Sequence, residues 1–437
     1  MALRARSPPK SRCRRRRRSS GSGSVARRAR RTGLTTSSRS VADVDAYIVD
    51  WLNLLVRWLH VIAGIAWIGS SFYFVWLDNH LEPPADPADD DKGVGGEVWS
   101  VHGGGFYHAQ KYRLAPARLP ERLHWFKWEA YTTWISGIFL TALLYWYGAE
   151  VYLIDPSVAE LSAPAAVGIA IAFIVGGWLV YDLLCRSPLA DDARVFAVVL
   201  LVLCGVLAWS LCELFGGRGA YIHFGIVLGT IMAANVFFVI IPGQKQMVAA
   251  AARGEMPDPG PGVRGKQRSV HNTYFTLPVL FVMTSNHYAM TYGHEYNWLI
   301  LIAISLAGAL IRAWFVARHK GKASPLPAVA AVVILAAVAI AIAPVSRGAQ
   351  DAGASIAQVR DVVAARCVSC HSSAPVHPAF PVAPLGIELD TDEQILNDAD
   401  RIYQQTVATH VMPLGNMTQM TSEERDVIGA WYRGLRR

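Results

Sequence analysis

The chain has 437 residues, of which 53% are hydrophobic and only 17% charged, whereas soluble domains carry about 25% charged residues. The formal net charge of +8 comes from the first forty residues alone. This composition excludes an ordinary soluble protein and indicates a membrane protein, in which the 14 tryptophans would favour the membrane–water interface.

The N-terminal tail, residues 1–40, is rich in Arg, Ser and Gly and contains 14 basic residues and no acidic one. The rest of the chain contains 27 basic and 33 acidic residues, so we expect no nucleic-acid partner. We expect the tail to be disordered. Because a basic tail conflicts with the topology that the loop charges predict, we interpret residues 1–40 as an over-extended gene start, with the true start near residue 41.

Apolar segments recur between residues 41 and 344, and each is close to the 20 or so residues that a transmembrane helix needs. Backbone polar groups must be satisfied internally in lipid, so each segment is predicted to be a helix. We therefore predict an all-α fold, with an eight-helix transmembrane bundle inserted in the lipid bilayer. The predicted spans are 46–77, 124–148, 164–186, 193–215, 219–241, 270–290, 297–318 and 325–344.

The charges of the loops predict how the bundle is oriented. Basic residues gather in the loops 242–269 and 319–324, whereas Glu150, Asp155 and Glu160 lie in a loop of the opposite side. Since cytoplasmic loops are enriched in Lys and Arg, the first span should start outside. Eight spans then return the C-terminus to the outside.

Ionisable side chains within spans are costly and are functional candidates by default. His60 lies deep in the first span, one turn after Arg57, on the same helix face. Such groups predict a polar substrate site or a redox-cofactor site between helices. The other candidates near span ends are His124, His223, His271, His287 and Arg312.

The loop 78–123 is long for a bundle connection, and long loops are often functional. Its second half contains Gly103, Gly104 and Gly105 between His102 and His108. Glycines allow a backbone to approach a ligand closely, and the neighbouring histidines and cations could hold an anion. A plain flexible turn is the alternative interpretation.

Residues 345–356 are small and polar and predict a linker to a domain formed by residues 357–437. Cys367, Cys370 and His371 form the C-x-x-C-H pattern of c-type haem attachment. The two thiols would form thioethers to one covalent haem c, and the imidazole would coordinate the iron. This predicts a small class I cytochrome c domain for electron transport.

A sixth iron ligand should lie further along the chain. Met/His ligation is usual in cytochromes c, and Met412 before Pro413 is the preferred candidate. Met420 is the alternative, while Met417, His377 and His410 are weaker candidates. Covalent haem attachment occurs on the periplasmic side of a bacterial membrane. The motif therefore predicts the same topology as the loop charges: a multi-pass protein of the bacterial inner membrane with its cytochrome domain in the periplasm.

Six segments resemble a known family: DWLNLLVRWLHVIAGIAWIGSSFYFVWLDNHL (50–81), WSVHGGGFYHAQKY (99–112), LHWFKWEAYTTWISG (123–137), IIPGQKQMV (240–248), HNTYFTLPVLFVMTSNHY (271–288) and MPLGNMTQMTSEER (412–425). With eight predicted spans and one C-x-x-C-H, the chain is similar to the membrane-integral, cytochrome c-linked urate hydroxylases of purine degradation. The resemblance covers nearly everything from about residue 45, and members begin near residue 41. It implies oxidation of urate to 5-hydroxyisourate, with oxygen from water. Electrons would pass singly through haem c to a respiratory cytochrome c oxidase or a soluble cytochrome c.

Urate is a planar monoanion near neutral pH, so its site needs a cation, a base and an apolar wall. Histidine suits the base because it titrates near neutral pH. We predict His60 as the base and Arg57 as the anion partner, with Trp67 stacking on the purine. His223 and His287 are possible partners on the outer side. If this placement is wrong, the candidates are His102, His108, His124 and His271.

Two other functions stay open. A quinol-to-cytochrome c electron-transfer protein would hold b haems between paired intramembrane histidines, for example His60 with His223. A non-enzymatic membrane anchor for a cytochrome c would not explain so many polar groups within the spans. Whether the membrane domain binds a further cofactor is not predicted.

Overall fold

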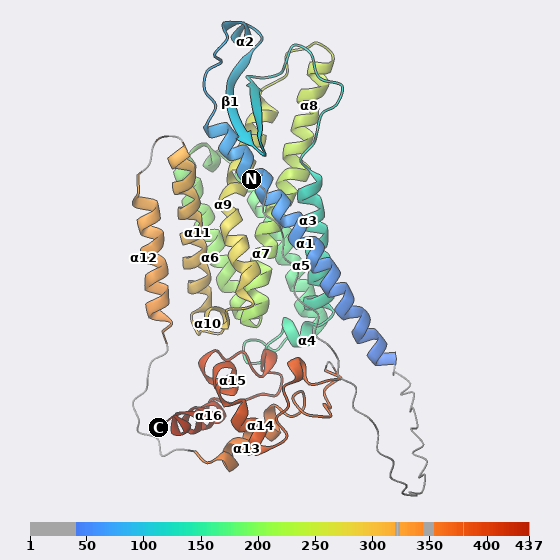
Figure 1. Ribbon diagram of the computed structural model, residues 1–437, viewed down its shortest axis with the longest axis vertical. Helices are drawn as coiled ribbons and strands as arrows, with labels where there is room; N and C mark the ends of the chain where they lie inside the picture. Colours follow the sequence, from blue (N-terminus) through green and yellow to red (C-terminus); the bar gives the residue numbers. More distant parts are fainter. Residues whose placement is uncertain (1–40, 320, 322–323, 344–353, 379, 437) are drawn as a thin grey trace, which may run out of the picture.

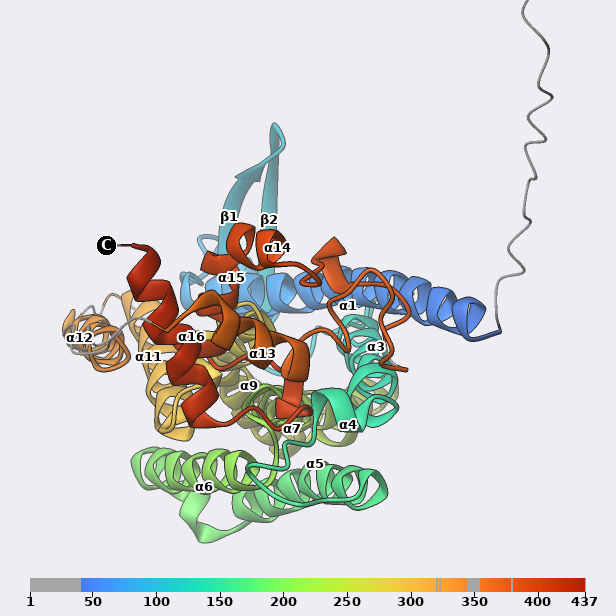
Figure 2. The ribbon, with the colours of Figure 1, turned by 90° about the horizontal axis from the view of Figure 1, so that it is seen from below.

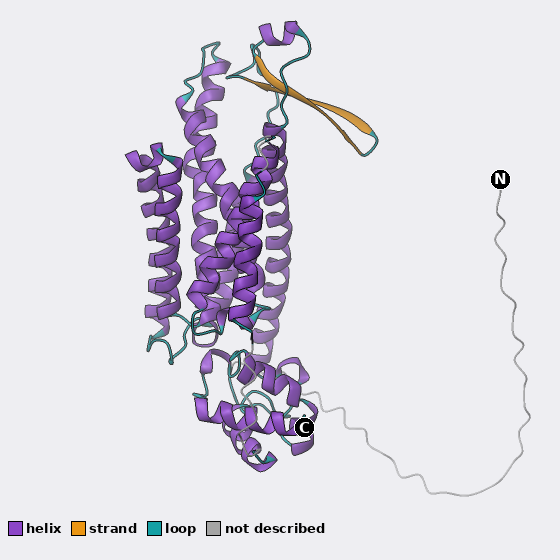
Figure 3. Cartoon of the chain, turned by 90° about the vertical axis from the view of Figure 1, so that its left-hand side faces the viewer, coloured by secondary structure: helices purple, strands orange, loops and turns teal. Residues whose placement is uncertain are grey.

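The computed structural model describes residues 41–319, 321, 324–343, 354–378 and 380–436 (Figure 1). Helix accounts for 70% and strand for 5% of the structure. A group of long helices stands side by side, and a smaller C-terminal body lies at one end of it (Figures 1 and 3). The predicted tail 1–40 and most of the predicted linker 345–356 lie outside the described residues.

Each of the eight predicted spans contains a helix, but only five helices in the described part of the chain are long and apolar enough to cross a membrane. These five helices are compatible with a multi-pass membrane protein. They are α1 (Val41–Asn79), α5 (Ala163–Arg186), α6 (Ala193–Leu214), the continuous helix Gly217–Ala252 and α11 (Asn297–His319).

The helices in the other three predicted spans are too short or too polar to be counted as membrane-crossing. α3 (Trp128–Thr141) has 14 residues and continues as a π-helical turn, η1 (Ala142–Trp146). α12 (Leu326–Ala341) has 16 residues and is apolar throughout. α9 (Gly260–Ser285) has 26 residues, but its first half is polar.

The continuous helix Gly217–Ala252 forms the centre of the bundle. It consists of α7 (Gly217–Ala234), a π-helical turn η3 (Asn235–Ile240) and α8 (Ile241–Ala252). Figure 2 shows α7 and α9 between the pair α1 and α3 on one side and the pair α5 and α6 on the other. Gly225 allows α9 to approach, because a Cβ there would lie 2.6 Å from Val282 Cγ1.

The segment between α1 and α3 contains a β-hairpin, so the prediction of a purely α-helical chain is wrong here. β1 (Val94–His102) pairs antiparallel with β2 (Gly105–Tyr112), with Trp99 opposite His108. Gly103 and Gly104 both have positive φ, as the tight turn of a two-residue hairpin requires. The glycine run therefore forms a hairpin turn, and the hairpin projects sideways from the bundle (Figure 3). A short helix α2 (Pro87–Asp91) precedes it.

The C-terminal body has its own apolar core, which contains Val359, Val363, Ile395, Ile428 and Trp431. Its longer helices start at side-chain caps: Ser355 caps α13, Thr391 caps α14 and Thr421 caps α16, each as a capping box with the third helical residue. The elements are α13 (Ile356–Arg366), η4 (Pro384–Gly386), α14 (Asp392–Asn397), α15 (Ala399–Tyr403), η5 (Gln404–Ala408), η6 (Leu414–Asn416) and α16 (Ser422–Leu435).

Short helices close the ends of the bundle. α4 (Ala149–Tyr152) and α10 (Ala289–Tyr292) lie at the end that faces the C-terminal body (Figure 1), while η2 (Pro188–Asp191) joins α5 to α6. The hairpin lies at the opposite end (Figure 1).

Candidate functional site

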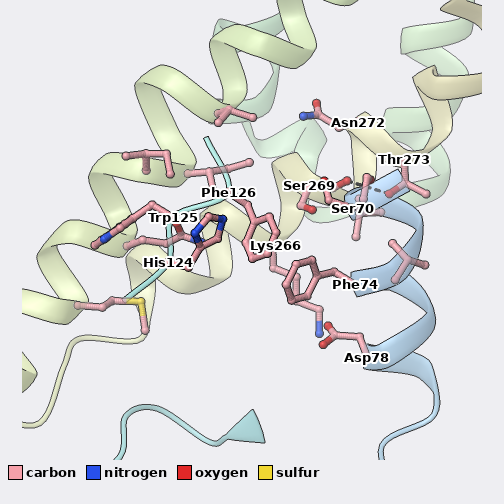
Figure 4. A pocket seen from close by; sticks show the side chains of 18 of the residues that line it. Ser70, Phe74, Asp78, His124, Trp125, Phe126, Lys266, Ser269, Asn272 and Thr273 are labelled. Carbon is pink, nitrogen blue, oxygen red and sulfur yellow. Dashed lines mark hydrogen bonds between the residues drawn. The ribbon is translucent and has the colours of Figure 1, made fainter. Parts of the chain in front are cut away.

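A cavity of about 970 Å³ opens between α1, the segment 112–126, the turn η3 with α8, and α9. Ligand sites in proteins typically have volumes of about 300–1,000 Å³, with apolar walls and a few polar groups. This cavity matches that description, because six Trp, Tyr or Phe side chains and a set of polar groups line it. The aromatic residues are Trp67, Phe74, Tyr112, Trp125, Phe126 and Tyr274; the polar ones include Ser70, Asp78, His124, Lys266, Ser269, Asn272 and Thr273, several of which are labelled in Figure 4.

Lys266 supplies a positive charge to the cavity. Within the described residues it forms no ion pair, whereas Asp78 is paired with Lys111 at 2.7 Å. Figure 4 shows the Lys266 ammonium group and the Asp78 carboxylate at the same end of the cavity. Lys266 is therefore available as the counter-ion of an anionic ligand.

His124 supplies an imidazole at the rim. Its side chain is 71% exposed, and its Nε2 lies 4.0 Å from Glu129 Oε1. The Phe126 ring meets it edge-on, with centroids 4.5 Å apart. The Glu129 Oε2 atom is buried and has no hydrogen-bond partner among the described residues. The imidazole of His124 thus lies at the rim of the cavity, facing a carboxylate.

A buried polar network fixes the wall of the cavity behind Asn272. Arg268, with 4% side-chain exposure, pairs with Asp182 at 2.8 Å and donates to Asn235 Oδ1 at 3.3 Å. Asn235 Nδ2 donates to Asn272 Oδ1 at 2.8 Å, and Asn272 Nδ2 donates to the Met232 carbonyl oxygen at 3.0 Å. The Asn272 amide is therefore held from both sides.

His271 lies behind this wall and not in the cavity. Its Nδ1 is 2.8 Å from the Tyr181 hydroxyl, and its ring stacks on Phe196 with centroids 4.6 Å apart. His271, the residue before Asn272 on α9, therefore directs its imidazole into the interior of the bundle and not into the cavity.

The structure does not place His60 and Arg57 at this cavity. His60 Nδ1 lies 3.0 Å from the Thr133 carbonyl oxygen and 3.1 Å from Ser136 Oγ, in the contact between α1 and α3. Arg57 is exposed and donates to Asn53 Oδ1 at 2.9 Å. Of the residues predicted on this helix face, Trp67 is the one that lines the cavity.

His223 is fully buried on α7. Its Nδ1 donates to the Gly219 carbonyl oxygen at 2.8 Å, and its Nε2 has no partner in the described part of the chain. Its ring lies against Tyr145 of η1, nine residues beyond Ser136 of α3, which is roughly 14 Å along the helix that these two elements form. The structure therefore does not bring His223 and His60 together at one depth.

The remaining predicted histidines are also separate from the cavity. His287 is exposed at the end of α9, and His102 is exposed at the hairpin turn. His108 contacts Glu97 Oε2 at 2.8 Å and stacks on Trp99 with centroids 4.2 Å apart. The backbone N–H of Ala85, then Gln110 and His108, lower the pKa of Glu97. This cluster holds the hairpin together.

Sequence reasoning did not select Lys266 and Trp125. The loop charges place Lys266 among basic loop residues, whereas α9 begins at Gly260 and carries it on the helix. Lys266, Ser269 and Thr273 match the three- and four-residue spacing of a single helix face, and this spacing is the signal that could have identified them.

Cys367, Cys370 and His371 lie together on one turn at the end of α13, where the backbone N–H groups of Cys370 and His371 both donate to the Cys367 carbonyl oxygen. His371 Nδ1 donates to the Ile387 carbonyl oxygen at 3.1 Å, which orients the ring and leaves Nε2 for a metal. Burial raises the pKa of Cys367 to about 12, unlike a redox-active thiol. These residues could hold a covalently attached haem c.

The two methionine candidates differ in burial. Met420 is buried in the core of the C-terminal body, in the cluster that Cys367 contacts. Met412 is half-buried in the loop between η5 and η6, where its N–H donates to the Gln405 carbonyl oxygen at 2.9 Å.

A family model described as urate oxidase N-terminal matches residues 46–343. The chain belongs to this family. The match covers α1 to α12, including all residues named around the cavity, and ends before the C-terminal body. Family membership relates the protein to urate oxidation. It indicates an oxidoreductase that acts on urate. Searches of curated proteins and of solved structures each found no match.

Proposed function

We propose that the protein is a membrane urate hydroxylase that oxidises urate to 5-hydroxyisourate and passes the electrons through haem c to the respiratory chain. Urate and water give 5-hydroxyisourate, two protons and two electrons. The observation that carries this proposal is that the urate oxidase family match spans the residues that build the cavity. The product oxygen comes from water. Because the two electrons leave through the haem and O2 is not reduced at the urate site, no peroxide forms there.

The cavity offers each group that a urate site needs. Lys266 balances the negative charge of the substrate, and the rings of Trp125 and Phe126 provide apolar surface for the purine. The fixed amide of Asn272 offers hydrogen bonds to its polar edges. His124 takes up a proton as the electrons leave, and Glu129 stabilises the resulting imidazolium. These roles replace those predicted for His60 and Arg57.

The C-terminal body is proposed as a class I cytochrome c domain on the periplasmic side of a bacterial inner membrane. The haem accepts electrons one at a time when it is bound. Cys367 and Cys370 would attach it, and His371 and Met412 would supply the two iron ligands, with Met420 as the alternative to Met412. A soluble cytochrome c or a respiratory cytochrome c oxidase accepts the electrons from this domain. The eight predicted helices form one membrane bundle.

A quinol-to-cytochrome c electron-transfer protein is the second candidate. His223 favours it, because a buried imidazole with Nδ1 bonded to a backbone carbonyl and Nε2 unpartnered is the arrangement of a metal-binding histidine. The structure, however, does not bring His223 to the depth of His60, since His60 contacts Thr133 and His223 contacts Tyr145. A pyridine haemochrome spectrum distinguishes the two candidates, since b haem and c haem absorb differently.

The test uses membranes that contain the full-length holoprotein, kept under nitrogen with soluble cytochrome c as acceptor. Urate should disappear while two cytochromes are reduced per urate, without peroxide, and label from ¹⁸O-water should enter the product. The double variant Cys367→Ala/Cys370→Ala, which cannot attach haem, should show no cytochrome reduction. Membranes that reduce cytochrome c with quinol and not with urate would refute the proposal.

A further inference from the structure

The loop that carries Met412 is held between two parts of the bundle end. At Gly293, directly after α10, an added Cβ would lie 2.2 Å from the Thr409 carbonyl oxygen. At Gly415, an added Cβ would lie 3.1 Å from the Ile154 carbonyl oxygen and 3.2 Å from that of Val151. The backbone on either side of Met412 thus touches the bundle, with α10 at one contact and the segment after α4 at the other.

Side chains strengthen the same contact. Val411 packs against the main apolar core of the bundle, which includes Leu153 and Tyr292. From the other side, Arg425 of α16 donates from Nη1 to the Met412 carbonyl oxygen at 2.9 Å and also to the Thr406 carbonyl oxygen. Burial lowers the pKa of Arg425, and the charge of Asp155 on the bundle opposes this shift. Figure 1 shows α4 and α10 next to the C-terminal body.

The backbone of this loop needs outside support. His410 has φ 52° and Asn416 has φ 44°, so both ends of the loop adopt the left-handed region. For non-glycine residues that region is unfavourable and persists where surrounding contacts impose it. Asn416 is held within the C-terminal body, because its Oδ1 accepts from the Met420 N–H at 3.0 Å. Next to His410, the Thr409 carbonyl oxygen meets the bundle at Gly293.

We infer that the bundle positions the Met412 loop, so that the methionine ligation of the haem depends on docking of the C-terminal body against α4 and α10. This inference rests on the proposed haem c, but not on urate as the substrate. It makes Gly293, Val411 and Gly415 positioning residues. The loop that carries Met412 then lies at the contact between the C-terminal body and the bundle.

The test weakens the contact from both sides in the purified full-length holoprotein. Gly293→Ala places a methyl group against the Thr409 carbonyl oxygen, at a position whose φ of –88° suits alanine. Val411→Asp places a charge in the apolar contact. The matched controls are Gly434→Ala, where nothing lies within 4 Å of an added Cβ, and Val382→Asp, whose side chain is 73% exposed.

The readouts are the methionine–iron charge-transfer absorption and the midpoint potential, because methionine ligation raises the potential. Both contact variants should lose the band and shift to lower potential, while haem staining on a denaturing gel stays unchanged. Both controls should behave as the wild type. If Gly293→Ala does not fold, Val411→Asp, on the other partner, decides the result.

Three outcomes would overturn the inference. The first is wild-type absorption and potential in the contact variants, and the second is equal loss of the band in the controls. The third is survival of the band in Met412→Ala, because the ligand would then be elsewhere. None of these readouts uses urate, so failure of the substrate assignment is detected separately, by the turnover assay.

Discussion

Replacing Arg268 by methionine should destabilise the bundle strongly, because it leaves a buried carboxylate with less compensation. Arg268 is 4% and Asp182 13% exposed, and their atoms are 2.8 Å apart. Removing one partner of a buried ion pair costs about 3–5 kcal/mol. Asp182 keeps a second contact to Arg186 at 2.7 Å, whose side chain is 69% exposed. We therefore expect a loss near the lower limit, about 3 kcal/mol.

The matched control is Arg186→Met, which removes the exposed partner of the same carboxylate and should cost no more than about 1 kcal/mol. The measurement is unfolding of the detergent-solubilised protein by increasing denaturing detergent, monitored by tryptophan fluorescence. Adding Asp182→Asn to Arg268→Met should recover part of the loss, because the unpaired charge disappears. If Arg268→Met costs no more than Arg186→Met, the buried pair does not stabilise the cavity wall as argued.

Three further predictions concern the cavity, the haem site and the hairpin. Lys266→Gln should raise the KM for urate about tenfold or more with little change in kcat, since a hydrogen bond to a charged group contributes about 1.5–3 kcal/mol. The control is Lys92→Gln, which removes an exposed ion pair outside the cavity and should leave both constants unchanged. Cys367→Ala should abolish or strongly reduce haem staining on a denaturing gel, and full staining would remove the cytochrome proposal. Because the pKa of Glu97 is lowered in the folded hairpin, its contribution should be complete above the ordinary glutamate pKa of about 4.3 and decline as the pH falls through the lowered value. The protection factors of the hairpin amides, which correct for the pH dependence of intrinsic exchange, should fall over that range in the wild type. A pH-independent difference in protection from Glu97→Gln would contradict this.

The sequence was informative where a structure depends on nearby residues. Each apolar segment predicted as a span contains a helix, because apolar length depends only on neighbouring residues. Thr421 and Glu424 have the local spacing of the capping box that starts α16. The hairpin was missed because a glycine run reads equally well as a flexible loop. The alternation of Trp99 and Val101 with polar residues was the unused signal for a strand.

The cavity could not be predicted because it depends on how far helices extend and how they are rotated against one another. The span predicted at 270–290 coincides with apolar residues, whereas α9 begins ten residues earlier, at Gly260. Its first turns are polar and partly exposed, and they pack against α8, so hydropathy gave no sign of them. Likewise, the contact of Gly225 with Val282 joins residues far apart in sequence. The spacing of Arg57 and His60 could predict that they share one face of α1. It could not predict that His60 on this face contacts α3.

The π-helical turn Asn235–Ile240 controls the register between the two halves of the central helix. Such a turn holds one residue more than an α-helical turn, so the surplus is absorbed locally and the helix continues with its faces unchanged. Loss of one residue within this turn would restore a regular helix and keep Gln244 and Met247 on the cavity. Loss of one residue in the regular part of α7 or early in α8 would instead rotate the remainder of the helix by about 100° and turn those side chains away. Chains of this family that lack the turn should therefore be one residue shorter at this point while presenting the same residues to the cavity.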